Sequence, residues 1–221
     1  PVGAQGMNTG LQDAYNLVWK LALVIQGVAD DSLLDTYNDE RIVIAQNLVS
    51  TTDRAFNIIT SQKRFMTFFR IHFLPGFLRF ILPVVQKTSF ILRTAFKIIS
   101  EIGLHYRFSR LSANKQDSEF PDKSPKPGDR VPYFNEIQTL LCDNKFQLLI
   151  FDGEKKDDHS QQEIQQLKET QDTLISTSEF HKNEATKAIY TKFGITKAGY
   201  YFIRPDNYIA LRSNSLPLQP V

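Results

Sequence analysis

The segment PVGAQGMNTGLQDAYNLVWKL, residues 1–21, runs from a glycine-bearing loop directly into an amphipathic helix. Its glycines are Gly3, Gly6 and Gly10. Glycine allows the backbone to turn sharply or a ligand to come close, and Asn8 or Thr9 can cap a helix that begins near Gly10 or Leu11. The unpaired N–H groups of such a helix start attract a phosphate, a carboxylate or an electron-rich ring edge. The spacing alone is equally compatible with a tight turn that binds nothing.

The residue identities in this segment resemble a motif of the class A flavoprotein monooxygenases, the aromatic-ring hydroxylases related to p-hydroxybenzoate hydroxylase and phenol 2-monooxygenase. In that family the pattern P-x-G-x-x-G-x-N-x-G-x-x-D-A-x-x-L-x-W-K-L follows a Gly-Asp motif. The matching positions are Pro1, Gly3, Gly6, Asn8, Gly10, Asp13, Ala14, Leu17, Trp19, Lys20 and Leu21. The resemblance implies a mixed α/β chain: the C-terminal helical part of a Rossmann-type FAD-binding domain, followed by a thioredoxin-like α/β domain.

The resemblance also implies a cofactor site and a reaction. The loop would lie beside the isoalloxazine of FAD, with the backbone amides of Met7 and Asn8 facing the pyrimidine edge, where preorganised donors stabilise negative charge. Pro1, Gly3 and Gly6 would complete the cofactor-binding set. NADPH or NADH would reduce FAD, and a flavin hydroperoxide would hydroxylate a phenol-like aromatic substrate. None of the residues in this chain is expected to be catalytic in its own right.

A complete hydroxylase of this kind opens with a strand, a G-x-G-x-x-G turn and a helix for the ADP half of FAD. This chain begins in the middle of the later motif. We therefore interpret it as the C-terminal portion of an FAD-dependent monooxygenase and expect the portion alone to be inactive. The alternative is a non-catalytic fragment or scaffold that retains the C-terminal modules.

Residues 30–59 predict a second helix, capped at its start by Asp31 or Ser32. The stretch LLDTYNDER within it resembles the family's L-x-x-Y-x-x-E-R pattern. Glu40 and Arg41 are adjacent and so point apart on a helix, which favours structural ion pairs over acid–base chemistry.

Residues 62–110 are basic and apolar, with nine Lys or Arg against the single acid Glu101. Arginines and lysines interrupt the apolar runs, so the sequence predicts no transmembrane segment. Pro75-Gly76 and Pro83 predict a break into short helices packed on the flavin domain. A basic amphipathic helix at a membrane surface is the alternative.

Polar, proline-rich residues 111–127 predict a linker between a domain of residues 1–110 and a domain of residues 128–221. The second domain begins with P-G-D-R-V-P and ends with YYFIRPDNYIALRS, both similar to phenol-hydroxylase-type members. Its residue patterns predict strands at FQLLIFDG and TLISTSEF, helices at QQEIQQLKETQD and NEATKAIYTKFG, and two final strands. The second of these helices is expected to end at Gly194. Asn207 stands where the family has glycine, and asparagine tolerates the positive φ that this turn needs.

Cys142 is the only cysteine, so the thioredoxin-like domain lacks a C-x-x-C pair and is interpreted as a structural and homodimerisation module. One cysteine fits a reducing, cytoplasmic compartment. The four histidines are scattered, so no metal site is predicted. A net charge of +2 gives no indication of a nucleic-acid partner.

Overall fold

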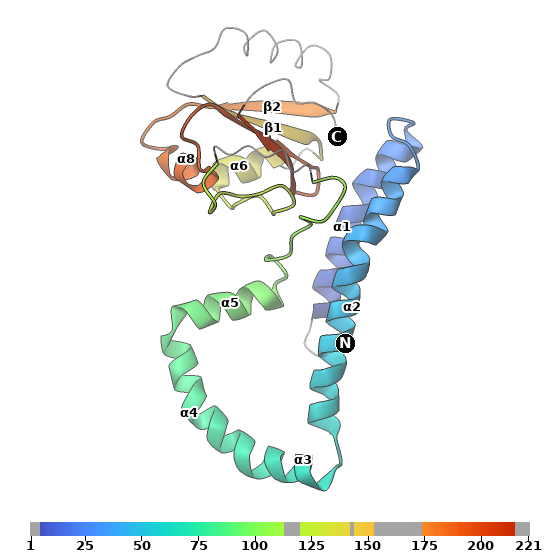
Figure 1. Cartoon of the computed structure of the whole chain (residues 1–221), viewed down its shortest axis with the longest axis vertical. Helices are drawn as coiled ribbons and strands as arrows, with labels where there is room; N and C mark the ends of the chain where they lie inside the picture. The colour runs from blue at the N-terminus through green and yellow to red at the C-terminus, as the bar shows by residue number, and fades with distance from the viewer. Residues whose placement is uncertain (1–4, 113–119, 142–143, 153–173, 215–221) are drawn as a thin grey trace. The chain divides into compact units, whose positions relative to one another are not determined.

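The computed structural model describes residues 5–112, 120–141, 144–152 and 174–214. The chain divides into two compact units, one of Pro1–Leu17 and Tyr37–Gly103, the other of Val18–Thr36 and Leu104–Val221. Helices α1 (Gln5–Ile25) and α2 (Ser32–Thr60) contribute residues to both units. The structure confirms the mixed α/β class (Figure 1).

The connection between α1 and α2 is fixed by local backbone geometry. Gly27 has a φ of 69° and ends α1 in the left-handed conformation that glycine adopts without a Cβ penalty. The Asp30 carboxylate accepts a hydrogen bond from the Ser32 amide at 2.9 Å. That bond lowers the pKa of Asp30. The helix was expected to be capped by Asp31 or Ser32, and that prediction is wrong: the side chain of the residue before them satisfies the first amide.

The basic apolar stretch is more continuously helical than its prolines predict. It forms α3 (Arg64–Phe68), a π-helical turn η1 (Phe69–Phe73), α4 (Leu74–Lys87) and α5 (Ser89–Ile99). Pro75 directly follows the π-helical turn within an unbroken helical run, and this wider turn accommodates a residue that has no N–H to donate to the preceding turn. Pro83 lies inside α4 on an exposed surface, where water can reach the carbonyl that it leaves without a donor. The expectation that both prolines break the helix is therefore wrong.

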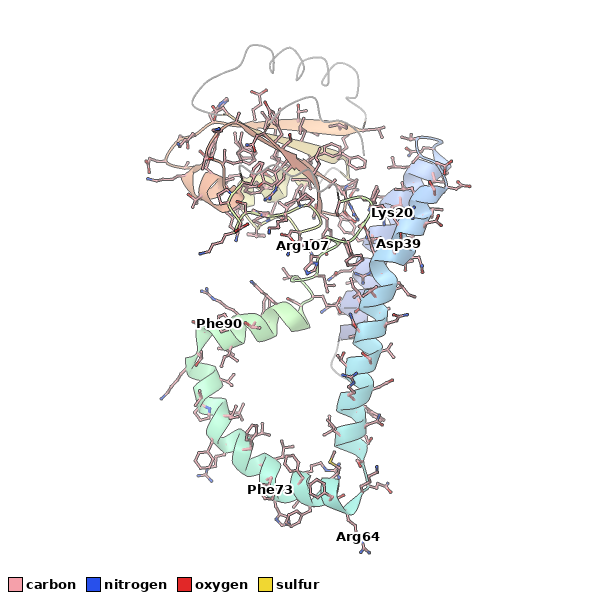
Figure 2. The ribbon with its side chains drawn as sticks, in the orientation of Figure 1. Lys20, Asp39, Arg64, Phe73, Phe90 and Arg107 are labelled. Carbon is pink, nitrogen blue, oxygen red and sulfur yellow. The ribbon has the colours of Figure 1, made fainter. Side chains whose placement is uncertain are left out.

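The stretch Arg64–Val85 is the one helical run among the described residues that is long and apolar enough to cross a membrane. Arg70 and Arg79 are too few to shorten it below spanning length, which corrects the expectation that charges interrupt every apolar run. Its most apolar window has no buried residue. Figure 2 shows the side chains of Phe73 and Phe90 projecting from the helices, with 57% and 76% of their surface exposed.

The second unit contains a four-stranded mixed sheet in the order β2-β1-β3-β4. Its strands are β1 (Phe146–Phe151), β2 (Ile175–Phe180), β3 (Gly199–Ile203) and β4 (Ile209–Ser213). The β1–β2 pair is parallel, whereas β1–β3 and β3–β4 are antiparallel. The predicted strands are confirmed: β1 is an apolar run, whereas β2, with the sequence ISTSEF, is largely polar and only partly buried.

Helices α6 (Asn135–Leu140) and α8 (Lys187–Phe193) lie on one face of this sheet (Figure 1). The alternation of side chains along β1 sends Leu149 and Phe151 to that face and Leu148 and Ile150 to the other. The helix-covered face forms the larger core, with Ile137 from α6 and other residues fully buried. Apolar residues on both faces of β1 therefore make it the central element of the unit.

The structure confirms two predictions about turns in the second unit. Gly194, with φ 69°, ends α8, and Asn207, with φ 67°, holds the left-handed position between β3 and β4. The predicted QQEIQQLKETQD helix and Cys142 lie outside the described residues.

The carboxyl ends of the parallel strands carry a polar cluster. Asp152, directly after β1, is bonded to His181 Nδ1 at 2.8 Å, accepts from the Lys182 amide at 3.1 Å, and accepts from the Tyr190 hydroxyl. Partial burial opposes ionisation of Asp152, but these hydrogen bonds outweigh it and lower its pKa. The cluster joins β1, the segment after β2, and α8.

Candidate flavin-contacting segment

Helix α1 begins earlier than the sequence predicts. It starts at Gln5, so Gly6, Met7, Asn8 and Gly10 are all helical. The predictions of a start near Gly10 or Leu11 and a cap at Asn8 or Thr9 are therefore wrong. Glycine weakens a helix by about 1 kcal/mol, but contacts along the following turns offset this cost. Nothing lies within 4 Å of where a Gly10 Cβ would be, so neither a tight turn nor a close approach requires this glycine.

The structure brings three of the five predicted cofactor-binding residues into the first turn of α1: Gly6, Met7 and Asn8. Met7 is 74% exposed, and Gly6 and Asn8 are partly buried. The N–H groups of a first helical turn lack intrahelical acceptors and carry the positive end of the helix dipole. Pro1 and Gly3 lie outside the described residues.

Polar side chains hold this part of α1 to α2. The Arg41 Nε donates to Asp13 Oδ1 at 2.5 Å, and the Asn16 amide donates to Glu40 Oε2 at 2.7 Å. Arg41 also reaches the Thr9 carbonyl at 3.3 Å. Arg41 and Glu40 are almost fully buried, at 3% and 0% exposed. The expected structural role of these two residues is confirmed, and Asp13 is the ion-pair partner of Arg41.

Comparison with known proteins is consistent with this geometry. A family model described as "FAD binding domain" matches residues 1–52, the part of the chain that contains α1 and its partners Glu40 and Arg41. The 6-methylpretetramide 4-monooxygenase of Streptomyces rimosus is 30% identical over 96% of this chain and 39% of its own length. The 3-(3-hydroxy-phenyl)propionate/3-hydroxycinnamic acid hydroxylase of Escherichia coli is 43% identical over 36% of this chain and 16% of its length. Residues 1–52 thus match an FAD-binding domain, and the chain is similar to flavin-dependent aromatic hydroxylases.

The chain thus spans about two fifths of the length of the Streptomyces relative. The rebeccamycin biosynthetic enzyme RebC, in a structure with reduced flavin, shares the fold, with a TM-score of 0.64 at 22% identity over 99% of this chain and 40% of that chain.

Sequence reasoning missed one residue that supports α1. Glu101 is buried, has a φ of 56°, and accepts a hydrogen bond from the Thr9 hydroxyl at 2.5 Å. The sequence feature that points to Glu101 is that it is the single acidic residue in the basic stretch 62–110. Burying an acidic side chain costs free energy unless a hydrogen bond or an ion pair compensates for it, so a lone buried acid points to a specific partner.

Other possible sites in the described ranges do not involve the first turn of α1. A hollow of about 520 Å³ is lined by residues of the second unit, including Phe134 and Thr191. Another, of about 330 Å³, lies between the end of α2 and Met66. Within the residues that the structure describes, no three His, Cys, Asp or Glu side chains gather as metal ligands would.

Proposed function

We propose that this chain is the C-terminal part of an FAD-dependent monooxygenase that uses NAD(P)H and O₂ to hydroxylate a phenol-like aromatic substrate. The observation that carries the proposal is the match of residues 1–52 to an FAD-binding domain, with Gly6, Met7 and Asn8 in a first helical turn. The printed name of the Escherichia coli relative includes a hydroxyphenyl substrate, which supports the phenolic class.

The first turn of α1 fits a flavin edge. The N–H groups of Gly6 and Met7 are in a first turn, Gly6 lacks a Cβ that would keep a flat ring away, and Met7 is exposed. Together with Asn8, and with Pro1 and Gly3 from the preceding segment, they would hold the pyrimidine edge of FAD. FAD supplies the oxidation chemistry when bound; these residues bind it, orient it and place fixed donors where negative charge develops.

We propose further that residues 128–221 form a thioredoxin-like module without C-x-x-C, that residues 1–110 complete the flavin domain, and that residues 111–127 link the two. The mixed sheet, with α6 and α8 on one face, supports the module assignment. Because one cysteine cannot form a dithiol pair, the module serves structure and homodimerisation in a cytoplasmic enzyme.

Replacing Asn8 with alanine is expected to weaken FAD binding about tenfold, the value of one hydrogen bond to the ligand, or to uncouple NAD(P)H oxidation from hydroxylation. The measurement compares FAD affinity and the ratio of hydroxylated product to NAD(P)H consumed, in the natural protein that contains this chain. Cys142→Ser is the control and should leave turnover nearly unchanged. The reverse pattern would refute the assignment and favour a scaffold that binds no FAD.

A second candidate function is attachment to an anionic lipid surface through residues 62–110. The exposed run Arg64–Val85 and the scarcity of acids in this stretch favour it. If it holds, the natural protein will float with phosphatidylserine vesicles at low salt and less at high salt. If the natural protein stays with the soluble fraction under both conditions, this candidate is eliminated.

A further inference from the structure

A buried arginine in the second unit lies among three aromatic rings. The Arg204 guanidinium carbon is 5.3 Å from the Trp19 ring centroid, 5.5 Å from that of Tyr106 and 5.8 Å from that of Tyr208. The residue is 1% exposed. A cation–π interaction is stronger when the cation is removed from water. The buried guanidinium of Arg204 therefore interacts with these rings more strongly than an exposed arginine would.

The charge of Arg204 is balanced by a residue two positions away. Its Nε donates to Asp206 Oδ1 at 3.0 Å and its Nη2 to Asp206 Oδ2 at 2.5 Å, which is the two-pronged geometry that only a guanidinium provides. The turn between β3 and β4 holds both residues, with the Arg204 amide bonded to the Tyr208 carbonyl at 2.8 Å. The ion pair with Asp206 therefore holds the Arg204 guanidinium in a defined position beside the Trp19 ring.

The C-terminal module also contacts Trp19 through its first strand. Phe146, which opens β1, packs edge-on against Trp19 with ring centroids 5.6 Å apart. Lys20, fully buried, lies 5.7 Å from the same ring. One turn of α1 is thus bound to two different strand ends of the C-terminal sheet.

We propose that Arg204 is a positioning residue, which together with Asp206 clamps the Trp19 turn of α1 to the C-terminal module. Helix α1 continues without interruption back to Gln5, and Trp19 lies about 18 Å along the helix from Met7 at 1.5 Å per residue. Holding this turn keeps the first turn of the same helix in place for the flavin. The effect on the flavin rests on the proposed function, whereas the contact of Arg204 and Asp206 with the Trp19 turn does not.

The clamp is tested with the double variant Arg204→Met, Asp206→Asn, which removes both charges together and leaves no buried ion unpaired. Trp19 is the only tryptophan of the chain, so its emission reports this site in the 221-residue protein. We expect a red-shifted emission and about tenfold faster amide exchange at residues 18–25. Arg212→Met is the matched control, because Arg212 lies 4.7 Å from the Phe120 ring in the same sheet. Emission and exchange equal to those of the control would overturn the clamp.

The consequence for the cofactor is tested in the natural protein that contains this chain. FAD should dissociate about tenfold faster from the double variant than from the Arg212→Met control, in line with the exchange result. Faster exchange with unchanged FAD dissociation would overturn the positioning role. A wild-type protein that takes up no FAD would refute the proposed function, while the exchange and emission measurements would still decide the clamp.

Discussion

Replacing Arg41 with methionine is expected to lower the free energy of unfolding by about 3 kcal/mol, the lower end for breaking a buried ion pair. The side chain is 3% exposed and bonds both the Asp13 carboxylate and the Thr9 carbonyl. Asp13 is 34% exposed, so water recovers part of the cost. For a chain of this size the thermal midpoint should fall by roughly 6–12 °C.

The matched control is Arg54→Met, because Arg54 is an exposed arginine on the same helix. Its replacement should change stability by less than about 0.5 kcal/mol. Urea unfolding followed by helical circular dichroism measures both variants. Equal midpoints would show that the buried contacts of Arg41 do not hold α1 to α2.

Replacing Gly128 with alanine is expected to destabilise the second unit by about 3 kcal/mol or more. Gly128 has a φ of 84°, and an added Cβ would lie 2.4 Å from the Arg107 amide nitrogen and 2.5 Å from its Cα. Both atoms are backbone and cannot rotate away. The same residue joins two segments, because its carbonyl accepts from the Tyr106 amide and its amide donates to the Ile209 carbonyl, each at 2.7 Å. Backbone strain and overpacking therefore add.

The same glycine-to-alanine substitution at Gly10 is expected to have the opposite effect on stability. Gly10 lies inside α1 with open space around its Cα, so alanine should raise stability by up to about 1 kcal/mol. The thermal unfolding midpoint should therefore fall for Gly128→Ala and rise for Gly10→Ala. A Gly128→Ala protein as stable as the wild type would show that the loop before α6 can move aside.

The C-terminal sheet was predictable because its signals are local. FQLLIF is an apolar run of strand length, and Gly194 and Asn207 occupy positions whose backbone conformation favours those residue types. Each of these signals is contained within a few neighbouring residues. A few neighbouring residues are therefore enough to predict these strands and turns, although the strands pair with distant segments in the sheet.

The helical part was predicted less well because distant contacts decide it. The start of α1 is stabilised by Glu101 and Arg41, which lie far along the chain and override the glycine signals. Pro83 is tolerated because its turn of α4 is exposed to water. The Arg204–Trp19 contact joins opposite ends of the chain, and no spacing rule connects them. The family resemblance located the flavin-contacting segment, but local patterns alone could not.

The measurement that tests the flavin assignment most directly is the absorbance spectrum of the purified natural protein that contains this chain, between roughly 350 and 500 nm, before and after incubation with FAD. We expect two bands of bound oxidised flavin that remain after gel filtration. A protein that is colourless as purified and still colourless after incubation and gel filtration would contradict the assignment of Gly6, Met7 and Asn8 to a flavin site.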